Sequence, residues 1–318
     1  MAVTLAQAKL NVQDDLQLGI IDEFAKSSFI MDNIPFDDCV SPTGGGATLT
    51  YGYTRLITQP TAAFRSVNSE YTPNEVSKQR YTTDLKVFGG AFEIDRIIAG
   101  MGGIADEVAL QSSQKVKAAS ALFADTIING NSSTNENVFD GLDVAVTGSD
   151  TEFNASGTAI DLSTSANVTA NYVQFLDMLD EFVSNLDGTP TALMMNSKMA
   201  AKMRAVARRA GMYQTTKNDY GQQVEYYGNI PFVDLGAKAG SNNPVVGIDE
   251  HGNTSIYAVR FGIDGFHAIS MAGQPPVKIW LPDFSTAGAV KKGEVEMVAG
   301  CALKSTKAAG VFRKIKVA

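Results

Sequence analysis

The chain has 318 residues, of which 44% are hydrophobic and 19% charged, and this ordinary globular composition provides core material for about two domains. Its formal net charge of -8 argues against a dedicated DNA-binding protein, because an acidic surface repels phosphate. Cys39 and Cys301 lie far apart and form no CxxC pair, which argues against a disulfide framework or a zinc site.

The N-terminal segment, residues 4–28, carries apolar side chains at near-helical spacing behind a possible N-cap at Thr4. Gly19 makes the predicted helix marginal, and the simplest interpretation is a helix packed on its own domain. The glycine-rich stretch 41–46 then breaks regular structure. A phosphate-binding loop is disfavoured there, because no GK[ST] follows and the next residues alternate like a strand.

Residues 48–92 are β-like, rich in Thr, Tyr, Val and Phe, and interrupted by Pro60 and by the polar run 68–79. They predict a long two-stranded ribbon with little apolar surface to bury. Because an isolated hairpin is marginal in water, such a ribbon needs a partner to lie on. The alternative is an ordinary hairpin folded over its own domain.

Residues 104–128 contain no glycine or proline and predict one long helix of roughly 37 Å. Its apolar stripe is thin, so the helix is expected to lie along a surface, with Val116 and Phe123 as main anchors. The segment Asn129-Gly130-Asn131 is expected to provide a left-handed stop at its C-terminus. The stripe consists of Ile104, Val108, Val116, Ala119, Phe123 and Ile127.

The polar stretch 148–166 predicts a crossing into a second domain. That domain is expected to be an α/β or α+β layer, because helical and strand patterns alternate along it. Its predicted helices span residues 172–186 and 197–210, and its predicted strands span 192–195, 224–227, 232–235, 245–248, 255–260 and 265–271.

The inventory of catalytic residues is poor. Of two histidines, His251 is predicted in an exposed turn and His267 in a strand with its hydrogen bonds satisfied. No HExxH, GxSxG, SxxK, Walker A or GxGxxG element is present. The adjacent residues 249–251 diverge instead of converging on one metal, which leaves a metal-assisted hydrolase as a weak alternative. We therefore expect no enzyme, no catalytic residue, no metal site and no cofactor.

A basic cluster marks the predicted helix 197–210. Two of its i,i+4 pairs carry like charges, which cost a few tenths of a kcal/mol each in an isolated helix. The cluster is interpreted as a solvated face, or as a contact with an adjacent subunit or with DNA. Its members are Lys198, Lys202, Arg204, Arg208 and Arg209.

The order of the segments carries a family resemblance. The strand FGGAFEIDRIIAG precedes the long helix, and the loop INGNSSTNENVFDGL follows it. This order resembles the major capsid proteins of tailed bacteriophages, which have the Hong Kong ninety-seven-type fold. The likeness continues through TALMMNSKMAAKMRAV, GNIPFVD, PVKIWLPDF and EVEMVAGCALKSTKAAGVFRKIKVA, and it covers most of the chain from about Thr48 onward.

The resemblance implies an α+β capsid fold. It implies an N-terminal arm at 1–47 packing on neighbours, an extended β-hairpin loop at 48–92, a peripheral domain at 93–165 and 285–318 containing the spine helix 104–128, and a central axial domain at 166–284. The two closing strands are expected to return beside the spine helix. Contacts between subunits are expected at Arg55, Arg65, Glu70, Glu75, Lys78 and Arg80.

The resemblance also implies a function. The chain is expected to form pentamers and hexamers of an icosahedral shell that encloses double-stranded DNA, bound non-specifically on the inner face. Scaffolding, portal and decoration proteins are further expected partners, and no membrane is expected to be involved. The protein is expected in the virion, after assembly in the host cytoplasm. An encapsulin-like cellular compartment with an enzyme cargo is the first alternative.

Overall fold

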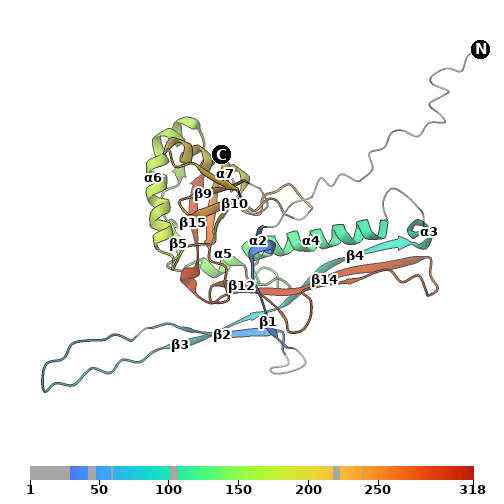
Figure 1. Cartoon of the computed structure of the whole chain (residues 1–318), viewed down its shortest axis with the longest axis horizontal. Coiled ribbons are helices and arrows are strands. Elements are labelled where there is room, and N and C mark those ends of the chain that lie inside the picture. Colours follow the sequence, from blue (N-terminus) through green and yellow to red (C-terminus); the bar gives the residue numbers. More distant parts are fainter. Residues whose placement is uncertain (1–28, 42–47, 59, 101–106, 218–222, 239) are drawn as a thin grey trace, which may run out of the picture.

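The computed structural model describes residues 29–41, 48–58, 60–100, 107–217, 223–238 and 240–318. Two sheets with helices against them form the body, and a long hairpin projects from it (Figure 1). The α+β class predicted from the sequence is confirmed. The helix expected over residues 4–28, and most of the glycine-rich stretch after Ser41, lie outside the described residues.

The first sheet is built around one long strand, β14 (Val290–Leu303). On one side β4 (Lys86–Asp95) pairs with it antiparallel, from Lys86 opposite Ala299 to Asp95 opposite Val290. On its other side lie β13 (Val277–Trp280) and β12 (Phe266–Met271), and β1 (Phe36–Val40) pairs parallel with β12 at the edge. β4 therefore extends across the boundary expected at Phe92.

Two glycines explain how closely β4 and β14 approach. A Cβ added at Gly89 would lie 2.0 Å from the carbonyl oxygen of Val295, so no larger residue fits the present backbone. Gly293 lies opposite Phe92, and a Cβ there would be 2.4 Å from the ring atom Cζ. The aromatic ring of one strand thus covers the glycine of the other.

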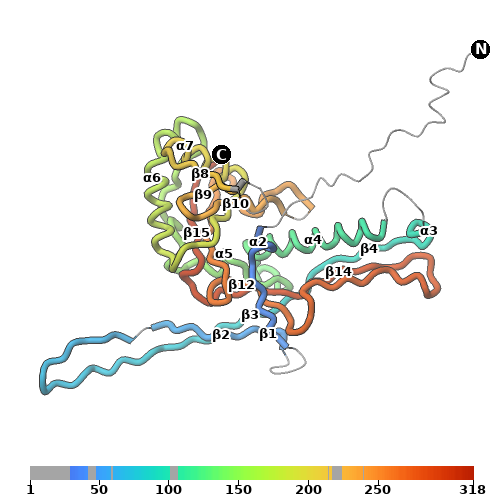
Figure 2. Tube along the Cα trace, in the orientation of Figure 1, coloured from blue at the N-terminus to red at the C-terminus, as the bar shows by residue number. Residues whose placement is uncertain are grey.

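The long helix α4 (Glu107–Asn129) lies along this sheet over about 34 Å (Figure 2). Its burial is concentrated near its C-terminus, where Phe123 stacks on Phe88 and Phe36 with ring centroids 5.8 and 6.0 Å apart. Val116 is only half-buried, so Phe123 is the main anchor. The predicted start at Ile104 lies outside the described residues.

The end of α4 differs from the prediction. Gly130 does not adopt a positive φ. Glycine is needed there because a Cβ would lie 2.3 Å from the carbonyl oxygen of Phe139 and 2.5 Å from that of Thr126. The helix therefore ends where its backbone closely approaches that of Phe139, and not at a residue with a left-handed conformation.

The second sheet has eight strands and carries the two other long helices, α6 (Ser165–Ser184) and α7 (Ser197–Arg209). Its order is β5 (Glu152–Phe153), β15 (Ala309–Lys316), β11 (Asn253–Val259), β7 (Ala192–Met195), β10 (Ile230–Asp234), β9 (Gln223–Tyr227) and β8 (Gln214–Lys217), with β6 (Ile160–Asp161) also paired to β15. The remaining short elements are α2 (Phe29–Asn33), α3 (Arg96–Ala99), α5 (Leu142–Val146) and a 3-10 turn η2 (Thr306–Ala308).

The turn from β7 into α7 is fixed by one buried side chain. Asn196 accepts a hydrogen bond from the backbone N–H of Met199 at 2.8 Å, which caps the helix. Its amide nitrogen donates to the carbonyl of Val246 at 3.0 Å and to Thr254 Oγ1 at 2.7 Å. Within the segment TALMMNSKMAAKMRAV, Met195 therefore ends the strand and Asn196 caps the helix.

Several predicted assignments are corrected by the pairing. β15 pairs with β11 in the eight-stranded sheet, so only β14 of the two closing strands lies beside α4. β12 and β13 pair with β14, although residues 166–284 were expected to form the other unit. α6 begins at Ser165, seven residues before the predicted start, because Thr164 caps it. The predicted strand 245–248 does not form.

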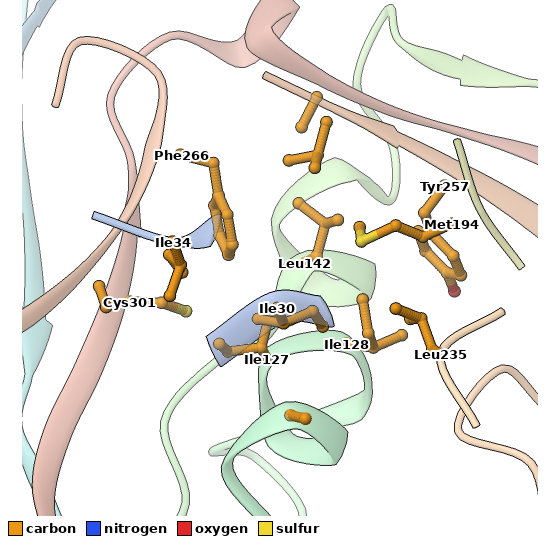
Figure 3. Packing of buried hydrophobic residues seen from close by; sticks show 14 of the residues in the cluster. Ile30, Ile34, Ile127, Ile128, Leu142, Met194, Leu235, Tyr257, Phe266 and Cys301 are labelled. Carbon is orange, nitrogen blue, oxygen red and sulfur yellow. The ribbon is translucent and has the colours of Figure 1, made fainter. Parts of the chain in front are cut away.

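One apolar core joins the two sheets. Leu142 of α5 lies between Ile127 and Ile128 of α4 and Met194 and Tyr257 of the eight-stranded sheet (Figure 3). A polar network lies beside this core. Arg313 forms an ion pair of 2.9 Å with Asp143 and a second ion pair with Glu152. Asp143 also accepts a hydrogen bond of 2.8 Å from the Tyr257 hydroxyl. The two sheets therefore pack as a single body.

Candidate functional site: the projecting hairpin

The hairpin consists of β2 (Thr50–Leu56) and β3 (Lys78–Asp84), with residues 57–77 between them. The strands pair antiparallel from Thr50 opposite Asp84 to Leu56 opposite Lys78. Alternating Thr and Tyr residues favour this extended pairing. Among the described residues the two strands pair in a sheet only with each other, and the hairpin leaves the body as a narrow projection (Figure 1).

One face of β2 fastens the base of the hairpin to the body. The Tyr53 hydroxyl donates 2.9 Å to the carbonyl of Leu303, and Arg55 Nε donates 2.9 Å to the carbonyl of Lys304. The Arg55 guanidinium also lies over the ring of Tyr81, 4.3 Å from its centroid. Burial raises the pKa of Tyr53, so this hydroxyl stays protonated and keeps donating.

The distal part of the hairpin has no such support. Every described residue from 56 to 80 is exposed, and Phe64 projects with its side chain fully in solvent. Local bonds hold the shape: Asn74 Nδ2 donates 2.8 Å to Thr61 Oγ1, and the Arg65 guanidinium donates 3.2 Å to the carbonyl of Ser69. Apolar side chains on this segment are therefore left without cover from their own chain.

The hairpin residues predicted to contact other subunits separate into two groups. Arg55 is bound to its own chain at Lys304, Thr306 and Tyr53, so it anchors the base. The alternation of Tyr51, Tyr53 and Arg55 on one strand face is the sequence signal that would have indicated this. The others are exposed on the hairpin: Arg65, Glu70, Glu75, Lys78 and Arg80.

The basic residues of α7 are also divided. Arg204 pairs with Glu225 at 2.7 Å, Arg209 donates 2.9 Å to Ser165 Oγ, and Lys202 donates to the carbonyl of Ser163. These three side chains tie α7 to α6 and β9. The side chains of Lys198 and Arg208 form no hydrogen bond or ion pair with any part of the chain that the structure describes.

Lys198 lies at the rim of an open depression of about 840 Å³ where α7 begins. Asp234 and Lys238 also line it, and Lys238 is paired with Asp125 at 3.2 Å. Asn196, which also lines it, has its side-chain oxygen engaged in the helix cap and its amide nitrogen bonded to Val246 and Thr254. No motif in the sequence indicated this depression.

Residues 249–251, considered above as metal ligands, form a turn. Asp249 accepts backbone N–H bonds of 2.8 Å from both His251 and Asn253, and its second oxygen accepts 2.9 Å from the Asn253 amide. These bonds, led by those from Asn253, lower the pKa of the Asp249 carboxyl. In the described part of the chain no three His, Cys, Asp or Glu side chains gather as metal ligands, and no helix combines the length and hydropathy needed to cross a membrane.

Solved structures match this chain along its whole length. A chain of the holo-SrpI encapsulin complex from Synechococcus elongatus PCC 7942 matches 99% of it and 97% of its own length, at 13% identity and TM-score 0.67. The capsid of Myoviridae phage XM1 matches over 99% of both chains, at 12% identity and TM-score 0.61. A chain of Mycobacterium phage Bobi matches over 100% of both, at 11% identity and TM-score 0.63.

Sequence comparison adds nothing to these likenesses: no protein-family model matches the chain, and neither does any curated protein. At 10 to 13% identity the solved structures show the fold alone. The three matches cover nearly the whole length of this chain and of the matched chains.

Proposed function

Because the chain has the Hong Kong ninety-seven-type capsid fold, we propose that it is the major capsid protein of a tailed phage, a structural subunit without catalytic turnover. The observation that carries this is the hairpin, whose described residues from 56 to 80 are all exposed. A two-stranded ribbon without core contacts is marginal alone. Its order in a particle then comes from backbone and side-chain contacts with neighbouring copies.

In this proposal the two sheets correspond to two parts of the capsid subunit. The five-stranded sheet with α4 forms the peripheral part, and the eight-stranded sheet with α6 and α7 forms the central part near the axis of pentamers and hexamers. The arm predicted at residues 1–47 is shortened in this proposal to the residues before Phe29, because Ile30 and Ile34 lie in the core of the body and β1 belongs to the five-stranded sheet. Arg65, Glu70, Glu75, Lys78 and Arg80 contact neighbouring copies, while Lys198 and Arg208 remain for a neighbour or for packaged double-stranded DNA.

The proposed partners are other copies of the chain, and then scaffolding, portal and decoration proteins. Assembly takes place in the host cytoplasm, and the product is the virion shell. An acidic chain suits this role, because the shell encloses DNA without needing to grip it tightly.

The test is to express the full chain alone and to measure particle mass by light scattering and shape by negative-stain electron microscopy. Closed shells, or discrete pentamers and hexamers, are expected. A monomer at every salt and protein concentration would overturn the proposal. An encapsulin-like compartment is the second candidate, supported by the match to the encapsulin chain. A copurifying cargo enzyme in place of nucleic acid would favour that candidate.

A further inference from the structure

A buried histidine without hydrogen bonds lies beneath the base of the hairpin. The His267 side chain, on β12, is fully buried, and neither ring nitrogen has a hydrogen-bond partner among the described residues. The backbone of Gly265 faces the ring, but no hydrogen bond of normal geometry forms. The prediction that His267 is a satisfied strand residue is therefore wrong. Buried polar groups are nearly always paired, so this exception needs an explanation.

The ring is covered by groups from three other segments. Tyr51 of β2 packs against it edge to face, with centroids 5.9 Å apart. Asp37 Oδ2, on β1, lies 3.9 Å from His267 Nε2, accepts 3.1 Å from the Tyr51 hydroxyl, and is 3.7 Å from Lys304 Nζ. We call these four residues the hairpin-base cluster. Its members come from both the hairpin and the sheet that carries it.

The charges in the hairpin-base cluster disfavour a proton on the ring. Burial lowers the pKa of His267 and the Lys304 ammonium lowers it further, while the Asp37 carboxylate and the backbone of Gly265 oppose them. Two other titratable side chains at the cluster, Cys39 and Tyr51, stay uncharged between pH 5 and 7.5. Burial raises the pKa of Cys39 to about 11 and raises that of the Tyr51 hydroxyl above its ordinary value.

We propose that His267 is an acid-sensitive latch: protonation of its ring weakens the packing of Tyr51 and β1 on β12 and loosens the base of the hairpin. A charged imidazolium has two N–H donors, and the one nearby carboxylate already serves Tyr51 and Lys304. Water reaches the ring once Tyr51 moves aside. This inference concerns the single chain and does not depend on the proposed function.

The direction of the effect follows from proton linkage. When the hairpin base is packed on the sheet (the seated form), the buried His267 ring binds a proton more weakly than when the base has loosened and the ring is hydrated. Added protons therefore favour the loosened form. Loosening begins as the pH falls through the ordinary histidine pKa of about 6.5 and levels off below the lower pKa of the seated form. Between pH 7.5 and 5.0 the opening equilibrium rises by at most about 30-fold.

Hydrogen–deuterium exchange with mass spectrometry on the full chain tests this at pH 7.5 and 5.0, after correction for the pH dependence of chemical exchange. Peptides from residues 36–40 and 50–56 should exchange faster at pH 5.0, while β7 in the other sheet should not change. Light scattering at each pH confirms that the assembly state is the same. Equal corrected exchange at both pH values would overturn the proposal.

Three variants identify the responsible group. His267→Phe keeps an aromatic edge beneath Tyr51 but takes no proton, so the acid effect should disappear; His267→Gln serves if that chain does not fold. His251→Phe, at the exposed histidine, should keep the effect. Asp37→Asn still accepts from Tyr51 and removes the charge that opposes the low pKa, so the effect should persist. An acid effect that survives in His267→Phe, or is lost in Asp37→Asn, contradicts the latch.

Discussion

Arg55 Nε donates a 2.9 Å hydrogen bond to the backbone carbonyl of Lys304, and this bond joins the hairpin to the end of β14. Arg55→Ala removes that bond and the contact with Tyr81, so we expect the seating of the hairpin to weaken by about 1–2 kcal/mol. Hydrogen exchange of residues 50–56 and 78–84 measures the change. Arg65→Ala, on the exposed distal part, is the matched control, and equal exchange in the two variants would contradict this role.

Removing the distal hairpin should separate folding from assembly. Residues 61–76 are exposed throughout, so replacing them with a short Gly-Ser turn should leave the melting temperature of the body nearly unchanged while no shells form. Circular dichroism melting and electron microscopy measure the two properties. Phe64→Ser is the control that keeps the length of the segment. Normal shells from the deletion variant, or failure of the body to fold, would each refute the assignment.

Phe123 should be the most costly side chain to truncate on α4. It is fully buried between the rings of Phe36, Phe88 and Phe139, so Phe123→Ala should lower the free energy of unfolding by about 3–5 kcal/mol. Its neighbour Leu122 is 40% exposed, and Leu122→Ala should cost much less. Denaturant titration of the unassembled chain compares them. Similar midpoints for both variants would show that this face of α4 is not packed.

Gly89 should tolerate no side chain. Gly89→Ala places a Cβ against the Val295 carbonyl, so β4 and β14 must separate. We expect the free energy of unfolding to fall by about 1–3 kcal/mol or more. Gly247→Ala is the control, because a Cβ there meets nothing within 4 Å and the backbone φ is not positive. Thermal melting of both variants gives the comparison. A Gly89→Ala chain as stable as the control would contradict the close approach.

The sequence predicted best where local signals agree. The helix over residues 107–129 follows from an uninterrupted run of helix-forming residues, and β7 with α7 follows from an apolar run ended by a capping Asn196. The exposure of the hairpin followed from its low apolar content. In each case the physical cause lies within a few residues of the chain.

What remained hidden depends on pairing between distant segments. β1 is a short strand with two aspartates, and its parallel partner β12 lies more than 200 residues away, so alternation alone does not reveal it. The family resemblance placed β15 beside α4, and periodicity could not correct this because it identifies a strand but not its sheet. The prediction for His267 was wrong because the groups that cover its ring, Tyr51 and Asp37, come from distant segments of the chain.

The core shared by the two sheets has a mechanical consequence. Bending the body between them would open the packing around Leu142, Met194 and Tyr257 and break the ion pair of Arg313 with Asp143. Close-packed interiors resist such gradual deformation. In a shell of the proposed kind, we therefore expect any change of diameter to come from tilting whole subunit bodies against one another, and not from bending within a subunit.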